Sequence, residues 1–228
     1  HPDLNMAPIQ EKTTRDAFAF EHLGGSFHVT PLAEYEMWGL VVSHNDINSF
    51  ADIYHDENSV DVKDLCTIWG SNVETNDFRK VQFKSDCYVC RFRYRSGTKF
   101  NHAELANTHL LSSDPEVLRG IGAVRKADQI RLKGVLVNYR AEGTTWERKS
   151  SLTRKDTGMG ACEVMFVEEV EVLRRGTPMW YAAFDAAKIA LILFVVLKIG
   201  LLVLKTILDQ RDFQNRVDAS SAYWRKCS

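Results

Sequence analysis

Proline, glycine and cysteine are scarce in this 228-residue chain, which contains 5, 13 and 5 of them. Such low proline and glycine contents exclude collagen-like and low-complexity linker sequences, and a hydrophobic content of 45% excludes a disordered tail. Five cysteines are too few for a small scaffold held together mainly by disulfides. The composition therefore fits one globular domain of ordinary size with an additional segment.

An excess of either charge is also missing. The 29 Lys and Arg residues balance 30 Asp and Glu residues, so the net charge is −1 and we expect no nucleic-acid partner. The charges are nevertheless segregated: residues 34–77 hold ten acids and one base, net −9, and residues 119–155 hold ten bases and three acids, net +7. Either the two segments neutralise each other across one fold, or the basic one faces anionic lipid or a polyanion.

A long apolar run lies near the C-terminus. Residues 189–204 read IALILFVVLKIGLLVL, and with their flanks they are long enough to cross a bilayer of about 30 Å. Trp180 and Tyr181 precede the run, where interfacial aromatic residues are expected. The pattern predicts a single transmembrane helix over 183–206, followed by a short polar tail over 207–228. The alternative is a buried or amphipathic helix of a soluble protein.

Lys198 and Lys205 are the informative charges of this helix, because residues seven apart share a helix face. Either Lys198 extends toward an interface, or it pairs with an acidic group on a neighbouring helix. The second reading predicts a subunit of a membrane assembly whose partner is an integral membrane protein with an acidic helix. More basic residues follow the span than precede it, which predicts a cytoplasmic tail and an extracytoplasmic domain.

The N-terminal region shows little periodicity. Residues 1–26 are expected to form an extended lead-in. The chain begins with His1 and shows no apolar signal segment in its first forty residues, so we expect an upstream signal or anchor outside this sequence.

The region 27–178 reads as an α+β domain that is mostly β. Short alternating or apolar runs predict strands near 27–32, 35–43, 62–70, 79–94, 129–139, 145–153 and 162–173. Residues 114–126 carry an Asp cap, a proline at the first helical position and apolar residues at helical spacing, which predict one short helix. Residues 95–113 read as a loop. This order predicts a small β-barrel or OB-like domain.

Four cysteines fall in this domain: Cys66, Cys87, Cys90 and Cys162. They allow two disulfides in three connectivities. Buried thiols remain an alternative, as does a zinc or redox site, although Cys87 and Cys90 lie in a strand-like stretch rather than at a helix start.

A polar loop follows the predicted strand at 145–153. Arg154, Asp156, Thr157 and Gly158 could bind a ligand through backbone donors, or they could form a tight turn between two strands. Asp156, Thr157 and Gly158 also match the aspartic-protease tripeptide, but the chain has no second copy to share the proton.

The remaining chemistry-bearing residues give no recognisable pattern. The seven histidines do not cluster at metal-ligand spacing. A triad of Cys162, His109 and Asp156 can be written, but neither spacing nor motif supports it. We therefore expect no catalytic residues, no metal and no cofactor, while a small-molecule ligand is left open.

One region resembles a known set of proteins. Residues 107–171 contain THLLSSDPEVLRGIGAVRKADQIRLKGVLVNY and then SSLTRKDTGMGACEVMFVEEVE. These segments are similar to a widespread family of uncharacterised bacterial envelope proteins, which share a histidine-leucine segment, a GDxVRLxGxLV strand and an SSLTRxDTGxGACExxxVE close. Here Ala127 replaces the usual Gly, and Met159 stands between the two glycines. The resemblance implies a bacterial envelope setting and an upstream signal anchor, and it implies no catalytic residues.

These observations converge on a non-enzymatic envelope protein of the bacterial inner membrane. Its periplasmic, β-rich domain would mediate protein interaction, and the helix with Lys198 would anchor or assemble it. Two alternatives stay open: a polyanion- or ligand-binding barrel that uses residues 119–155, and an envelope hydrolase.

Overall fold

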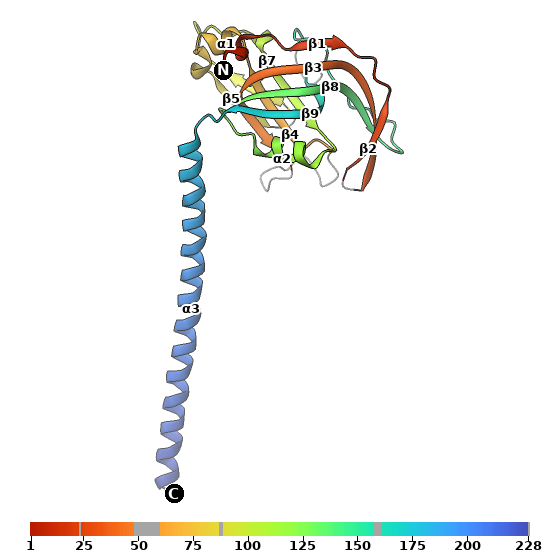
Figure 1. The fold of residues 1–228 in the computed structure, drawn as a ribbon. Coiled ribbons are helices and arrows are strands. Elements are labelled where there is room, and N and C mark those ends of the chain that lie inside the picture. The colour runs from red at the N-terminus through yellow and green to blue at the C-terminus, as the bar shows by residue number, and fades with distance from the viewer. Residues whose placement is uncertain (23, 48–59, 87–88, 157–160, 228) are drawn as a thin grey trace. The chain divides into compact units, whose positions relative to one another are not determined.

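The computed structural model describes residues 1–22, 24–47, 60–86, 89–156 and 161–227. The chain divides into two units, His1–Gly176 and Thr177–Ser228. The first unit is built mainly from strands and the second from one helix (Figure 1). The fold is thus mixed α and β, mostly β, with one long apolar helix at its C-terminal end.

The helices and strands follow one another in an order close to the predicted one. In chain order they are η1 (Pro2–Asn5), β1 (Ile9–Lys12), β2 (Phe18–His22), β3 (Gly25–Asp46), β4 (Lys63–Ile68), α1 (Ser71–Glu74), η2 (Asp77–Lys80), β5 (Gln82–Asp86), β6 (Val89–Arg93), η3 (His102–Glu104), β7 (Leu105–Leu111), α2 (Pro115–Ala123), β8 (Gln129–Ala141), β9 (Glu163–Arg174) and α3 (Pro178–Cys227).

One strand organises the sheet of the first unit. β3, 22 residues long, pairs in antiparallel fashion with β1, β2, β4 and β8. From β4 the pairing continues to β7, then in parallel to β9, and then in antiparallel fashion to β8. Because β8 also pairs with β3, the path of pairings returns to its first strand.

Both faces of β8 are buried in its middle part, and each face contributes to its own core. Tyr35 and Leu136 belong to one hydrophobic cluster. Val29 and Val135 belong to a second cluster. Since Val135 and Leu136 are neighbours in β8, successive side chains enter different cores, as the alternation of a strand requires.

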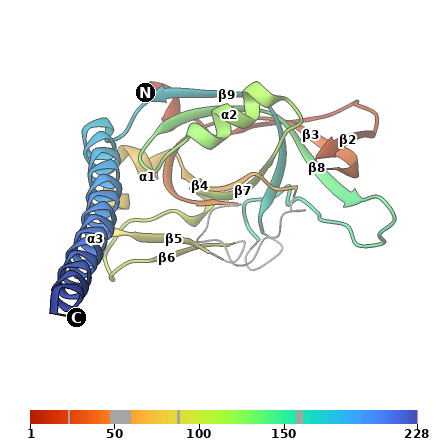
Figure 2. The same cartoon turned by 90° about the horizontal axis from the view of Figure 1, so that it is seen from below.

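The helix α2 forms where the sequence predicted it. The side chain of Asp114 accepts hydrogen bonds from the backbone N–H groups of Glu116 and Val117, which caps the helix start. Val117 and Ile121 are buried in the same cluster as Tyr35. Figure 2 shows α2 beside β9, and a Cβ at Gly120 would lie 2.4 Å from Val170 of that strand.

The segment 79–94, whose pattern fits a strand or a hairpin, forms a hairpin. β5 and β6 form a separate two-stranded sheet in which Lys84 faces Arg91. A disulfide between Cys66 of β4 and Cys90 of β6 joins this hairpin to the main sheet.

Three segments differ from the sequence-based expectation. β7 occupies Leu105–Leu111, inside the segment expected to be a loop, and all but its first residue are buried. A strand buried on both faces shows no polar alternation, so periodicity does not reveal it. Residues 145–153 form no strand, and only an isolated bridge joins Arg148 to Tyr139. Residues 1–26, expected as an extended lead-in, contribute β1 and β2 to the sheet.

The second unit is the helix α3. It spans 50 residues and continues through 207–227, where a polar tail was expected. Its stretch from Pro178 to Asp218 is long and apolar enough to cross a membrane. Leu193 and Leu202 are 64% and 65% exposed, so none of the residues that the structure describes covers them.

Candidate functional site

The most unusual polar residues of the first unit surround His109. This residue lies in β7, and in the β4–β7 ladder it is directly opposite Asp64. Its side chain is 0% exposed, and its strand neighbour two residues on, Leu111, belongs to a hydrophobic cluster. A titratable ring thus stands among apolar side chains, where an unpaired polar group would be costly.

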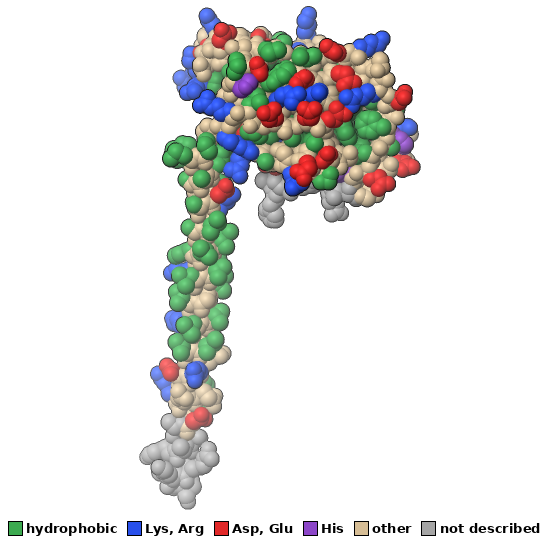
Figure 3. Space-filling view, in the orientation of Figure 1, with side chains coloured by type: hydrophobic (Ala, Val, Ile, Leu, Met, Phe, Trp, Pro, Cys, Tyr) green, Lys and Arg blue, Asp and Glu red, His purple; other side chains and the backbone are tan. Residues whose placement is uncertain are grey.

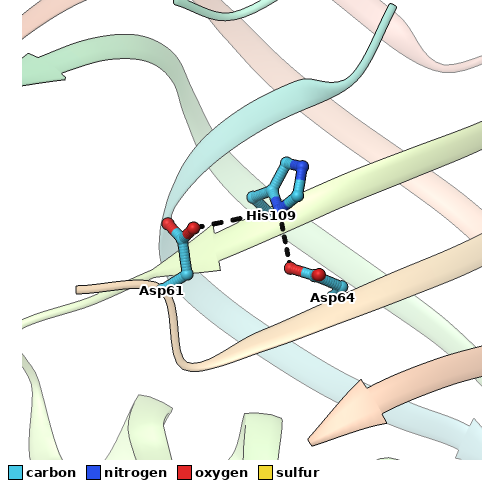
Figure 4. A group of neighbouring side chains, drawn as sticks. All are labelled: Asp61, Asp64 and His109. Atoms are coloured by element: carbon cyan, nitrogen blue, oxygen red, sulfur yellow. Dashed lines mark hydrogen bonds and ion pairs between the residues drawn. The ribbon is translucent and has the colours of Figure 1, made fainter. Parts of the chain in front are cut away.

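Two carboxylates surround one nitrogen of the ring. Nδ1 of His109 lies 2.6 Å from Oδ1 of Asp64 and 3.9 Å from Oδ2 of Asp61 (Figure 4). Asp64 comes from β4, and Asp61 from the segment just before it. Both carboxylates are buried, so the three side chains form a compact charged cluster.

The other side of the cluster is completed from β8 and the segment after it. Nη2 of Arg148 lies 2.7 Å from Nε2 of His109, and the hydroxyl of Tyr139 donates to Oδ1 of Asp61 at 3.2 Å. Backbone hydrogen bonds in both directions hold Tyr139 against Arg148. Arg148 supplies a positive charge against the two carboxylates, and His109 donates from Nδ1 to Asp64.

The environment shifts the pKa values of two members. Burial lowers the pKa of His109, but its hydrogen bonds to Asp64 and Cys162 and the charges of Asp64 and Asp61 raise it to about 10. Arg148 opposes this rise, because it can donate to Nε2 only when Nε2 carries no proton. Burial also raises the pKa of the Asp61 carboxyl, against the nearby positive charge of His109.

Asp61, Asp64 and His109 also carry the ligand types of a metal site. Their ligand atoms lie within 4.8 Å of one another, and two carboxylates with an imidazole are suited to a divalent cation such as Zn²⁺. However, a metal on Nδ1 would leave the ring proton on Nε2, donor against donor with Arg148. The arrangement therefore fits a salt-bridged network better than a metal centre, and a cation would require Arg148 to turn away.

Cys162 extends the network on a third side. Nδ2 of Asn107 donates to Sγ of Cys162 at 3.2 Å. The side chain of Cys162 also hydrogen-bonds His109. Cys162, His109 and Asp64 are of the types that serve as nucleophile, base and orienting acid. Cys162 is only 6% exposed and His109 0%, so the described structure offers a substrate no open approach to them.

A second buried cluster contains the arginine of the predicted ligand loop. Arg154 turns inward: Nη1 donates to Oε1 of Glu163 at 2.6 Å, and Nη2 donates to the hydroxyl of Tyr35 at 2.8 Å. Its guanidinium also lies 5.2 Å from the ring centre of Trp69 and 5.3 Å from that of Tyr35. Arg154 is thereby engaged within the protein.

Glu163 carries the perturbed carboxyl of this second cluster. Burial raises its pKa to about 7 although Arg154 lowers it, and the charge of Asp156 adds to the rise. Oε2 of Glu163 is buried without a hydrogen-bond partner among the described residues. Asp156 accepts a hydrogen bond from the hydroxyl of Ser151 at 2.6 Å. Arg154 and Asp156 thus have separate hydrogen-bond partners, and Thr157 and Gly158 lie outside the described residues.

The structure shows the state of three of the four cysteines of the first unit. Cys66 and Cys90 form a disulfide, and Cys162 is a buried thiol rather than a disulfide partner. Cys87 lies outside the described residues. The sequence allowed this pair among its three connectivities but could not select it.

The two lysines of α3 are exposed, and Nζ of Lys198 lies 5.5 Å from the ring centre of Phe194. Lys205, seven residues on, follows in the same helix. Their pairing with an acidic helix remains a prediction.

The basic segment 119–155 is largely engaged in ion pairs. Arg131 binds Glu36 and Glu169, and Lys133 lies 3.5 Å from Glu169. Figure 3 shows basic and acidic side chains interleaved on this face. The pair between Arg131 and Glu36 joins the basic segment to the acidic one, as the neutralisation reading requires.

No sequence motif or spacing marks His109 as a site residue or connects it with Asp61 and Asp64. The available signal was a pair of aspartates three residues apart beside an apolar run. No protein-family model, no curated protein and no solved structure matches this chain.

Proposed function

We propose that this chain is a membrane-anchored protein of the bacterial envelope, with its β-rich unit outside the cytoplasm and its C-terminal end inside. The β-rich unit acts as a non-enzymatic interaction module, and α3 anchors it and assembles it with an integral membrane partner. The observation that carries the proposal is the long apolar surface of α3, which Lys198 alone interrupts between residues 189 and 204 and which no other described part of the chain covers.

The fold of the module is proposed to be a small OB-like barrel. The pairing order β3, β4, β7, β9, β8 and back to β3 supports this reading. So do the parallel contact of β7 with β9 and the position of α2 between β7 and β8. OB-like barrels serve many binding functions through their surface and loops, so the fold alone names no ligand.

The buried clusters support a module without catalysis. His109 is held by Asp64 and Arg148, and Arg154 is held by Glu163 and Tyr35. Side chains held in this way stabilise one conformation and present little reactive surface, although Oε2 of Glu163 has no hydrogen-bond partner among the described residues. Neither alternative gains a specific observation, because ion pairs engage much of the basic segment 119–155 and the buried thiol lacks an approach.

Lys198 provides the test of assembly. The full chain carrying an affinity tag is purified in mild detergent, and the proteins that accompany it are identified. We expect one integral membrane partner whose recovery falls at least about tenfold for Lys198→Leu, since an unpaired charge in the membrane costs roughly 2.5–3.5 kcal/mol.

Arg211→Leu is the matched control, because it removes an exposed positive charge from the same helix outside the predicted span 183–206 and should leave recovery of the partner unchanged. Equal recovery of every partner with wild type and Lys198→Leu would contradict the assembly role. Extraction of the chain by alkaline carbonate without detergent would contradict the anchoring role.

A further inference from the structure

The densest basic region of the chain is the β5–β6 hairpin with its flanks. Residues 79–99 contain seven Lys and Arg residues and one acid, Asp86, so their net charge is +6. All seven basic side chains are exposed. We call the described residues of this region, 79–86 and 89–99, the basic hairpin.

Strand alternation gathers several of these charges on one face. Arg91 and Arg93 are exposed in β6, whereas Phe92 between them is half-buried. Lys84 is directly opposite Arg91 in the β5–β6 register, so it joins the same face. Arg95 follows two residues after Arg93, beyond the end of β6, and is also exposed.

The opposite face rests on an aromatic support. Phe92 packs against Phe100 and His102, with ring centres 5.4 Å and 4.9 Å apart. The hydroxyl of Tyr94 lies 2.8 Å from Nε2 of His102. The disulfide at Cys90 fixes β6 to β4, so the basic face is held in place before any partner arrives.

Two acids partly offset this charge. Asp77, just before the hairpin, pairs with Lys80 at 2.6 Å and accepts a hydrogen bond from the backbone N–H of Lys99. Asp86 pairs with Lys84 at 2.5 Å and with Arg91 at 3.2 Å. The side chains of Arg93, Arg95 and Lys99 make no ion pair in the part of the chain that the structure describes. A cluster of exposed like charges repels itself and attracts anions.

The short connection between the β-rich unit and α3 favours lipid headgroups as the anion that this charge attracts. Only three residues separate the end of β9 at Arg174 from the start of α3 at Pro178. If α3 is anchored as proposed above, this short connection keeps the β-rich unit near a bilayer. Anionic headgroups attract nearby bases with about 1 kcal/mol each, which falls off within a Debye length.

We propose that the basic hairpin binds the anionic headgroups of the membrane that anchors α3, with Arg93, Arg95 and Lys99 as the principal contacts. The partially exposed ring of Tyr94 lies beside these bases and suits the polar region of a bilayer. This inference rests on the proposed anchoring of α3.

The test uses the full chain in nanodiscs of phosphatidylcholine, with and without phosphatidylglycerol. Hydrogen–deuterium exchange is followed for the peptides that cover 89–100. We expect slower exchange in the anionic discs, by about fivefold for each contacting base at low ionic strength. The difference should vanish in about 1 M salt, where the Debye length is about 3 Å.

The variant R93Q/R95Q/K99Q should lose most of the protection. The matched control is R140Q/K149Q/K155Q, which removes three exposed bases elsewhere in the same unit. This control should retain the protection from exchange. Circular dichroism and the intact disulfide verify that both variants fold.

The outcomes separate the two proposals. A chain that enters the nanodiscs but exchanges equally in both lipids overturns the hairpin proposal alone. Equal loss of protection in both variants also overturns it, because the effect would then be general electrostatics. Protection by heparin but not by phosphatidylglycerol would overturn it in favour of a soluble polyanion. A chain that fails to enter the nanodiscs overturns the anchoring, and the hairpin proposal with it.

Discussion

Asp64 and His109 face each other across the β4–β7 ladder and are joined by a hydrogen bond of 2.6 Å between two fully buried side chains. Their strands both belong to the closed path of pairings, so the contact links two members of that path. A charge pair in this position stabilises the fold only while both partners remain.

Removing one partner should therefore be costly. We expect Asp64→Ala to lower the free energy of unfolding by about 3–5 kcal/mol, because it removes a buried charge and leaves Nδ1 of His109 without its hydrogen-bond partner. Urea unfolding of the full chain in a non-ionic detergent, followed by tryptophan fluorescence, measures the change. The control is Asp3→Ala, which removes an exposed pair with His1 and should cost less than about 1 kcal/mol. A similar loss in both variants would contradict the role assigned to the buried pair.

Stability should fall as the pH rises. The pKa of Glu163 is raised from 4.5 to about 7, so its contribution is complete below 4.5 and is lost as the pH rises to 7. The pKa of His109 is raised from 6.5 to about 10, so its contribution is complete below 6.5 and is lost toward pH 10. We expect the midpoint of thermal unfolding to be higher at pH 5 than at pH 8.5.

Glu163→Gln separates the two groups. An amide does not titrate, so this variant should flatten the slope between pH 4.5 and 7 and leave the slope above pH 7 unchanged. A wild-type profile that rises with pH across this window would refute the assignment.

Two glycines should respond oppositely to alanine. A Cβ at Gly134 of β8 would lie 2.1 Å from the carbonyl oxygen of Phe166 in β9, where the register shifts. Gly134→Ala must separate these strands, and we expect a loss of more than about 3 kcal/mol. Nothing lies within 4 Å of a Cβ at Gly122 in α2, so Gly122→Ala should stabilise by up to about 1 kcal/mol. Chemical denaturation of both variants tests the pair, and equal effects would count against the strand geometry.

The disulfide should stabilise the hairpin. Cys66 and Cys90 are 24 residues apart, a loop for which closure contributes about 3 kcal/mol. We expect the double variant Cys66→Ser and Cys90→Ser to lose about this amount and to become sensitive to trypsin at Arg91 and Arg93. Cys162→Ser is the comparison, since that thiol closes no loop. Unchanged trypsin resistance of the hairpin in the double variant would disprove its dependence on the bond.

The sequence predicted those elements whose patterns are local. The Asp114 cap and the spacing of Val117 and Ile121 predicted α2, and apolar length predicted α3. The sequence pattern did not reveal β7, because both faces of this strand are buried. His109 was therefore expected in a loop. The site was missed for a related reason: Asp64 meets His109 only through the register of β4 with β7, and register depends on long-range pairing.

The net charge of a sequence segment was also an incomplete guide to the charge on the surface. Residues 119–155 carry many bases, but Arg131 and Arg154 are engaged by Glu36 and Glu163. Residues 79–99 also carry many bases, and all of them are exposed. In β6, Arg91 and Arg93 alternate with Phe92 along the strand. Net charge over a window therefore does not reveal how much charge stays available.

The many pairings of β3 affect how the chain can be made. Its partner β8 begins at Gln129, and the ring of strands is completed only by β9, which ends at Arg174. During synthesis the long β3 strand must therefore wait, with exposed backbone donors and acceptors, until roughly a hundred further residues have emerged. Only a few residues later the apolar helix α3 begins, so the sheet is completed just before α3 emerges. A chaperone that shields β3 during this interval would raise the yield of folded protein, and truncation before Glu163 would leave a chain prone to aggregation.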